Sequence, residues 1–368
     1  MGAIRLLLAL AVVSVHIHWD SLWAGPGGTV AVQAFFMISG FYIAMTLSGP
    51  YAGAPFRFWL NRALRLYPAY LIAAAAGLML NLLLAPEFSD AFASLPTGAK
   101  ILLATSNAVI FGQDWVMFSG VRDGSLSLVS NFRDSDPELW SFLVDPPAWS
   151  LGVELTFYLL APFLFRLKTS VIVALLLLSA ALRLALVLHG LKADPWSYRF
   201  FPTELAMFLL GGLAHRAGVV INRSKRFARH GFLGGVALAG TLLFIMLYGA
   251  IPLGGTAKKI IFYATFAISL PFIFDYVKSN KIDRIIGDLS YPLYISHWPV
   301  LMAVRHWLGP IDTVPEALIS VSACIAAAIG LCAAVDMPIQ RLRASVRNVE
   351  LGRVPETRRR LSAGLLPE

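Results

Sequence analysis

Ten apolar runs of roughly 16 to 22 residues recur along the 368-residue chain, close to the length of about 20 residues that an α-helix needs to cross a bilayer. The runs lie near residues 3–19, 28–48, 66–85, 148–166, 169–188, 201–220, 231–249, 259–277, 291–308 and 315–336. Charged residues make up only 14% of the chain, whereas a soluble domain carries about 25%. The pattern predicts an all-α fold, a polytopic membrane helix bundle of about ten transmembrane helices, and excludes soluble two-domain folds.

Basic residues gather in every second connection between these runs and in the C-terminal tail. They are Arg57, Arg62, Arg65, Arg166, Lys168, Arg216, Arg223, Lys225, Arg226, Arg229, Lys278, Lys281, Arg284, Arg341, Arg343, Arg347, Arg353 and Arg358–Arg360. Cytoplasmic connections of membrane proteins carry such an excess of Lys and Arg, so both termini are expected in the cytoplasm. The net charge of +9 follows from this pattern, and no nucleic-acid partner is expected.

One shorter apolar run, 101–111, lies between two acidic stretches. If it crossed the bilayer, the later alternation of basic connections would break, so it is expected to be re-entrant or interfacial. The stretch 113–147 is then the one sizeable external loop. A membrane domain is expected over 1–340, followed by a basic, disordered cytoplasmic tail over 341–368.

Arg5 and His16 are ionisable residues on the first apolar run. Eleven residues correspond to about three helical turns, so the two share a face about 16 Å apart along the axis. Asp20 is four residues after His16 and within its reach, whereas His18 points elsewhere. Charged groups inside a membrane usually face a cavity or pathway. The alternative is that Arg5 reaches lipid headgroups and the histidines lie at the outer interface.

Two later runs carry further polar groups. Ser150, Glu154 and Tyr158 follow at four-residue spacing and form a polar stripe on an otherwise apolar helix. Tyr291 and His297 lie on the ninth run, within "LSYPLYISHWPV". Glu154 could instead pair with an arginine to lock the bundle, and His297 could be a packing residue.

Several motifs in order resemble the acyltransferase-3 superfamily of bacterial integral-membrane acyltransferases. Arg5 and His16, separated by ten residues, match its arginine–histidine pair. The other matching stretches are "AFFMISGFYIA" (34–44), "FRFWLNRALRLYPAYL" (56–71) with the Arg62-x-x-Arg65 pair, "WSLGVELTFY" (149–158) and "LSYPLYISHWP" (289–299). The family often has an acid before the Phe-Phe pair, where this chain has Gln33, so that position is assigned no catalytic role.

The resemblance implies transfer of an acyl group, usually acetyl, from cytoplasmic acyl-CoA to a hydroxyl on an extracytoplasmic glycan, in a bacterial inner membrane. His16 is the expected base, oriented by Asp20 or Glu154, because histidine has a pKa near neutrality. Binding of the donor is assigned to a set of six residues: Arg5, Arg62, Arg65, Ser150, Tyr291 and His297. Acetyl-CoA is the expected donor, and no metal is expected.

The expected partners are acyl-CoA, a glycan or glycoconjugate acceptor and membrane lipids. The rival function is a transporter or flippase that uses the same intramembrane ionisable residues as a permeation path. No inverted repeat and no matched pair of broken apolar segments supports that rival.

Overall fold

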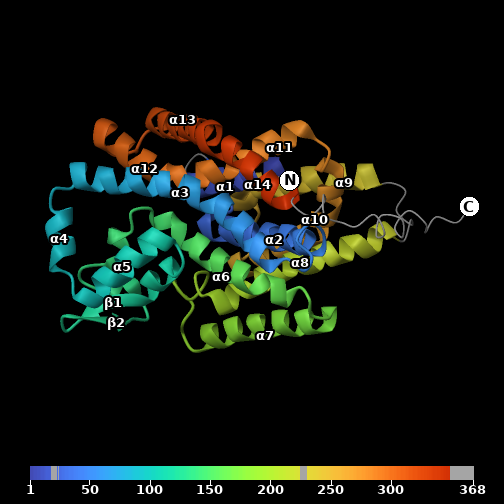
Figure 1. The fold of residues 1–368 in the computed structure, drawn as a ribbon, viewed down its shortest axis with the longest axis horizontal. Helices are drawn as coiled ribbons and strands as arrows, with labels where there is room; N and C mark the ends of the chain where they lie inside the picture. Colours follow the sequence, from blue (N-terminus) through green and yellow to red (C-terminus); the bar gives the residue numbers. More distant parts are fainter. Residues whose placement is uncertain (18–22, 24, 224–229, 349–368) are drawn as a thin grey trace, which may run out of the picture.

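The computed structural model describes residues 1–17, 23, 25–223 and 230–348. Helices dominate these residues, and their only sheet has two short strands. Figure 1 shows the long helices side by side, with a small group of short elements at one end of the molecule. This is the predicted all-α polytopic membrane bundle.

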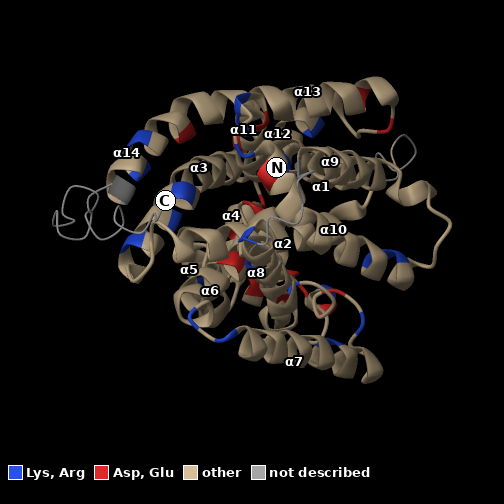
Figure 2. Ribbon diagram, turned by 90° about the vertical axis from the view of Figure 1, so that its right-hand side faces the viewer, with Lys and Arg blue, Asp and Glu red and all other residues tan. Residues whose placement is uncertain are grey.

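Each of the ten predicted spans coincides with one helix. These are α1 (Gly2–His16), α2 (Gly27–Ser48), α3 (Pro55–Leu84), α6 (Trp149–Leu164), α7 (Thr169–Leu188), α8 (Phe201–Arg223), α9 (His230–Met246), α10 (Gly255–Val277), α12 (Ser290–Leu308) and α13 (Val314–Leu331). Within the described residues, seven helical segments are long and apolar enough to cross a membrane, and α1 and α9 are shorter apolar helices. Most of the length of these helices is free of charged residues, as Figure 2 shows.

Helix α3 begins earlier than expected. Arg57, Arg62 and Arg65 were expected in the connection after 28–48, but all three lie inside this 30-residue helix. The apolar run predicted at 66–85 corresponds only to the second part of α3. Residues 55–65 mix apolar and basic side chains, and they continue the helix because its charged side chains can face an aqueous hollow. Arg62 and Arg65, two of the three residues expected to bind phosphate, therefore lie on one helix.

The stretch between α3 and α6 forms a small folded unit at one end of the bundle (Figure 1). Its elements are α4 (Phe88–Ser94), α5 (Thr97–Val109), η2 (Gln113–Phe118), β1 (Ser119–Arg122), β2 (Ser125–Leu128), η3 (Phe132–Asp134), η4 (Leu139–Phe142) and η5 (Pro146–Ala148). Asp123 and Gly124, both with positive φ, form the tight turn between the antiparallel strands. Helix α5 contains most of the run 101–111, and at about 1.5 Å per residue its 13 residues are too short to cross a bilayer.

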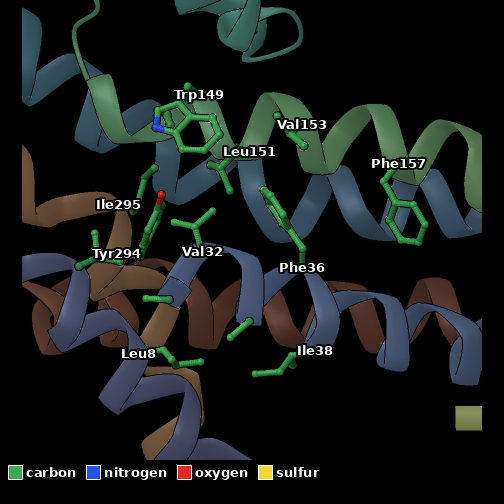
Figure 3. Packing of buried hydrophobic residues seen from close by; sticks show 14 of the residues in the cluster. Leu8, Val32, Phe36, Ile38, Trp149, Leu151, Val153, Phe157, Tyr294 and Ile295 are labelled. Carbon is green, nitrogen blue, oxygen red and sulfur yellow. The ribbon is translucent and has the colours of Figure 1, made fainter. Parts of the chain in front are cut away.

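Helices α2 and α8 pack with their backbones close together. A Cβ added to Gly40 would lie 1.9 Å from the Phe208 carbonyl oxygen, and one added to Gly211 would lie 1.9 Å from that of Met37. Only glycine permits this approach of two backbones. Val32 and Phe36 of α2 also point toward Leu151 of α6, as Figure 3 shows. Helices α2 and α6 are thereby held at the centre of the bundle.

Two further helices and a π-helical turn cover the end of the bundle where α1 begins. Helix α11 (Lys281–Asp288) brings Asp283 to the start of α1, where its carboxylate accepts hydrogen bonds from the Met1 ammonium at 2.6 Å and the Gly2 amide at 2.7 Å. These bonds lower the pKa of Asp283 even though its burial acts to raise it. The π-helical turn η7 (Cys332–Asp336) leads from α13 into α14 (Met337–Asn348), and a 3₁₀ turn, η6 (Tyr248–Ala250), follows α9.

Helix α14 overlaps the predicted disordered tail. The tail was expected from residue 341, but residues 341–348 continue α14, which packs against α3. Helix α14 remains regular because one of its faces rests on α3. Residues 349–368 lie outside the described part of the chain.

Candidate functional site

Three adjoining hollows share one set of arginines. The central cavity lies between α1, α2, α3, α6 and α12. The α14 hollow is bounded by α3 and α14, and the α11 hollow by α1 and α11. Arg5, Arg62 and Arg65 line all three. The structure thus brings together the three arginines predicted to bind the donor.

Acidic side chains also line the α14 and α11 hollows, but in the described chain none lies within ion-pair distance of these arginines. Among the described residues, no ion pair involves Arg5, Arg62 or Arg65. The Arg62 side chain is buried, donates to the Asn61 side-chain oxygen at 3.3 Å and leaves its Nε without a partner. A buried cation without an ion-pair partner is costly, so the buried Arg62, with the half-buried Arg5 and Arg65 around the same hollows, indicates a site for an anion.

Glu154 lies on the wall of the central cavity. Its carboxylate accepts a hydrogen bond from Ser39 Oγ at 2.6 Å and another from the Tyr158 hydroxyl. The alternative that Glu154 forms a salt bridge to lock the bundle finds no support in the ion pairs of the described chain. Two hydroxyl donors therefore fix the orientation of this carboxylate toward the cavity.

Two tyrosines of α12 and one serine of α6 complete the cavity wall. The hydroxyls of Ser150 and Tyr294 lie 2.7 Å apart, and Tyr294 also donates to the Pro147 carbonyl at 3.0 Å. Tyr291 donates to the Leu66 carbonyl, which places α12 against α3. Ser150 and Tyr291, both assigned to donor binding, lie on the cavity wall, and Tyr294 is a lining residue that was not predicted.

His16 is the last residue of α1 and lies beside two rings of α12. Its ring centroid lies 5.2 Å from that of His297 and 5.5 Å from that of Trp298. The His297 ring lies 6.0 Å from the Tyr294 ring, its Nδ1 is 2.6 Å from the Tyr294 carbonyl oxygen, and its Nε2 has no partner. His297 thus lies beside His16 rather than beside the three arginines. Asp20 and His18 lie outside the described residues.

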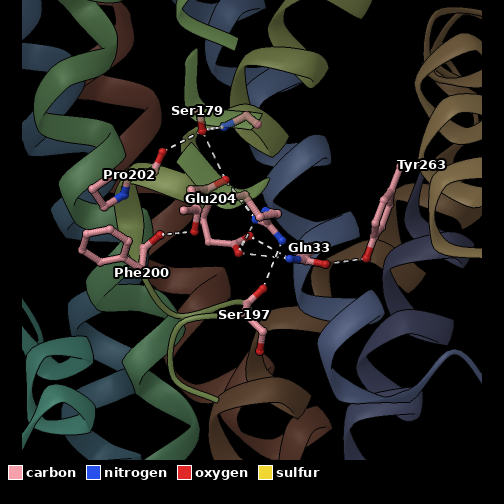
Figure 4. Close-up of polar contacts among 10 residues, drawn as sticks. Gln33, Ser179, Ser197, Phe200, Pro202, Glu204 and Tyr263 are labelled. Carbon is pink, nitrogen blue, oxygen red and sulfur yellow. Dashed lines mark hydrogen bonds and ion pairs between the residues drawn. The ribbon is translucent and has the colours of Figure 1, made fainter. Parts of the chain in front are cut away.

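A second polar cluster, not predicted as a unit, joins α2, α7, α8 and α10 (Figure 4). Glu204 is fully buried and accepts from Gln33 Nε2 at 3.0 and 3.1 Å and from Arg183 at 2.7 Å. The Tyr263 hydroxyl in turn donates to Gln33. Charged residues inside apolar runs could have revealed Arg183 and Glu204, but nothing in the sequence pairs them with Gln33.

The folded unit outside the bundle holds a buried carboxyl against α6. A Cβ added to Gly152 would lie 2.8 Å from Asp114 Oδ1, and this oxygen has no hydrogen-bond partner. Burial raises the pKa of Asp114 to about 7. Burial also raises the pKa of Asp145, which lies just before α6 and is fully buried. The described residues contain no group of three or more His, Cys, Asp or Glu side chains that could hold a metal ion.

The chain is similar to curated O-acetyltransferases. O-acetyltransferase OatA of Staphylococcus aureus (strain NCTC 8325 / PS 47) is 27% identical over 337 residues, covering 82% of this chain and 50% of the relative. Peptidoglycan O-acetyltransferase OatA of Listeria monocytogenes serovar 1/2a is 26% identical over 337 residues, with 82% and 49% covered. The chain therefore spans about half the length of these curated relatives. No solved structure matches it.

A family model described as an acyltransferase domain matches residues 1–335, which is most of the chain. The motifs that resembled this family, from Arg5 to His297, all lie within the matched range. The chain belongs to the acyltransferase-3 family.

Proposed function

We propose that this multi-pass membrane protein transfers an acetyl group from cytoplasmic acetyl-CoA to a hydroxyl of an extracytoplasmic glycan. The two relatives are named as O-acetyltransferases, and the name of one specifies peptidoglycan. In this proposal the protein lies in a bacterial inner membrane among its lipids, with both termini in the cytoplasm. The alternating basic connections support that orientation.

One observation carries the proposal: unpaired arginines line hollows that adjoin a cavity bearing an oriented carboxylate. Coenzyme A has several phosphates at one end and a thioester at the end of a narrow arm. The phosphates would bind Arg5, Arg62 and Arg65, whose planar forks match phosphate oxygens. The arm would enter the central cavity past Tyr291 and Ser150 and carry the thioester toward Tyr294 and His297. The separation of Arg5 and His16, about 16 Å along α1, suits such an arm.

His16 is the general base in this mechanism. It takes the proton of the acceptor hydroxyl as that oxygen attacks the thioester carbon. The carbon–sulfur bond then breaks, and the proton passes to the departing CoA sulfur. Asp20 or Glu154 would stabilise the imidazolium formed on His16, and Glu154 is already oriented by Ser39 and Tyr158.

Mass spectrometry of envelope glycans from cells with and without the gene tests the proposal. Glycans from cells carrying the gene are expected to gain mass in acetyl increments that mild base removes as acetate. Re-expression of the parent chain, but not of Arg62→Ala, should restore the increments in deleted cells. Identical glycan spectra with and without the gene would refute the proposal.

A further inference from the structure

Arg343 of α14 extends the arginine cluster to a fourth guanidinium. It was expected in a disordered tail, yet it lines the α14 hollow together with Arg5, Arg62 and Arg65. Its Nη2 donates to the Asn61 side-chain oxygen at 3.3 Å, and the Asn61 amide donates back to the Arg343 carbonyl at 3.3 Å. The side chain is therefore held at the hollow by α3.

Asn61 brings two like charges together. Arg62 and Arg343 each donate to the same Asn61 oxygen at 3.3 Å. Such neighbours repel each other, and the repulsion grows as water is excluded. The described residues include no ion pair for Arg343, and its buried Nε has no hydrogen-bond partner. A bound anion would satisfy both guanidinium groups and remove the repulsion.

The course of the chain after α13 directs one face of α14 to this hollow. The π-helical turn η7 ends at Asp336, and π-helical turns often occur at functional sites. Asp336, Gln340, Arg343 and Ala344 all line the hollow, and their spacing places them on one helix face. Arg341, two residues before Arg343, is exposed and is absent from the wall of the hollow.

We infer that Arg343 binds a phosphate of the acyl-CoA donor and that α14 forms part of the donor site. This inference rests on the proposed function, because it assumes that the donor is a nucleotide with several phosphates. A ligand with three phosphate groups can contact more arginines than the Arg5, Arg62 and Arg65 set provides. Arg343 supplies a further guanidinium group from α14, next to that of Arg62.

Calorimetric titration of CoA into the purified full-length chain in detergent micelles tests the inference. Arg343→Gln should raise the CoA dissociation constant about 10-fold, because a charge-assisted phosphate contact is lost. Arg343→Lys keeps the charge without the fork and should lie between Arg343→Gln and the parent. Arg341→Gln, the matched control on the same helix, should stay within about twofold of the parent, as expected of an exposed charge outside the site.

A second variant keeps the test decisive if Arg343→Gln unfolds. Gln340→Glu removes no packing, because Gln340 is exposed, but adds a negative charge to the wall of the same hollow. It should also weaken CoA binding severalfold. Parental affinity in Gln340→Glu and in folded Arg343→Gln, with weakened binding in Arg62→Gln, would overturn the role of Arg343 and leave the proposed function standing. Failure of the parent chain to bind CoA would overturn both.

Discussion

Two buried arginine clusters in this bundle are built in opposite ways. Arg183 donates to Glu204 at 2.7 Å, to the Thr203 carbonyl at 2.9 Å and to the Ser197 carbonyl at 3.0 Å. Arg62, in contrast, leaves its Nε without a partner, and no ion pair in the described chain involves it or Arg5. The first cluster is satisfied by the protein itself, whereas the second faces hollows.

The contrast separates a structural role from a binding role. Both clusters would appear in a sequence as arginines in or beside apolar runs, and both are costly to bury. A satisfied cluster joins helices, as Glu204 does for α2, α7 and α8. An unsatisfied cluster keeps its charge available to a ligand that supplies the missing anion. Substitutions at Arg183 and Arg62 test this distinction.

The largest effect is expected from breaking the satisfied cluster. Arg183→Ala leaves the fully buried Glu204 carboxylate without its cation, and loss of one partner of a buried pair costs about 3–5 kcal/mol. Thermal unfolding in detergent should show a large fall in melting temperature, and Lys168→Ala, at an exposed site, should not. The fraction that stays folded should bind CoA like the parent. An unchanged melting temperature would remove the structural role of this cluster.

The unsatisfied cluster should respond in the reverse way. Arg62→Gln removes a charge-assisted phosphate contact worth about 1.5–3 kcal/mol, so the CoA dissociation constant should rise about 10- to 100-fold. Its melting temperature without CoA should stay at the parental value or rise, because repulsion within the cluster decreases. Titration calorimetry and thermal unfolding of the same preparation measure both quantities. Unchanged CoA affinity would show that these arginines do not bind CoA and only follow the positive-inside rule.

The smallest effect concerns Asp114, a buried carboxyl outside both clusters. Its pKa is raised from 3.8 to about 7, so between these values the folded chain holds a proton that the unfolded chain releases. The free energy of unfolding contributed by this group therefore falls as pH rises through that window and levels off above it. Asp114→Asn mimics the neutral form of the carboxyl. Its melting temperature should be a few degrees above that of the parent at pH 8 and equal to that of the parent at pH 4. Equal melting temperatures at pH 8 would contradict the burial of an unpaired charge at this site.

Sequence patterns predicted the helices well because the signals are local. Length and hydropathy located ten of the helices of the bundle, and the three arginines expected to act together line the same hollows. The turn at Asp123–Gly124 was also readable, because an Asp-Gly pair favours a two-residue hairpin turn, but 113–147 was treated as one loop.

The rest depends on contacts between distant segments. Helix α14 follows the last span as an amphipathic stretch with Ile339, Leu342 and Val346 on one face, a pattern that hydropathy averages hide. Nothing in the sequence places Arg343 on Asn61, or His297 beside His16, because these pairs form only when α14 packs on α3 and α12 on α1. Gln33 departs from the family's acid, and its partner Glu204 lies 171 residues away.

Transfer of labelled acetyl from acetyl-CoA to envelope glycan, in membranes matched for protein level, tests the central claim most directly. His16→Ala should lose about 10²–10⁴-fold of the transfer rate, because general-base catalysis contributes that much. His18→Ala, two residues along the chain, should keep most of the activity, and both variants should bind CoA like the parent. Transfer by His16→Ala at near the parental rate would contradict the account, and the base would then have to be sought in the neighbouring His297.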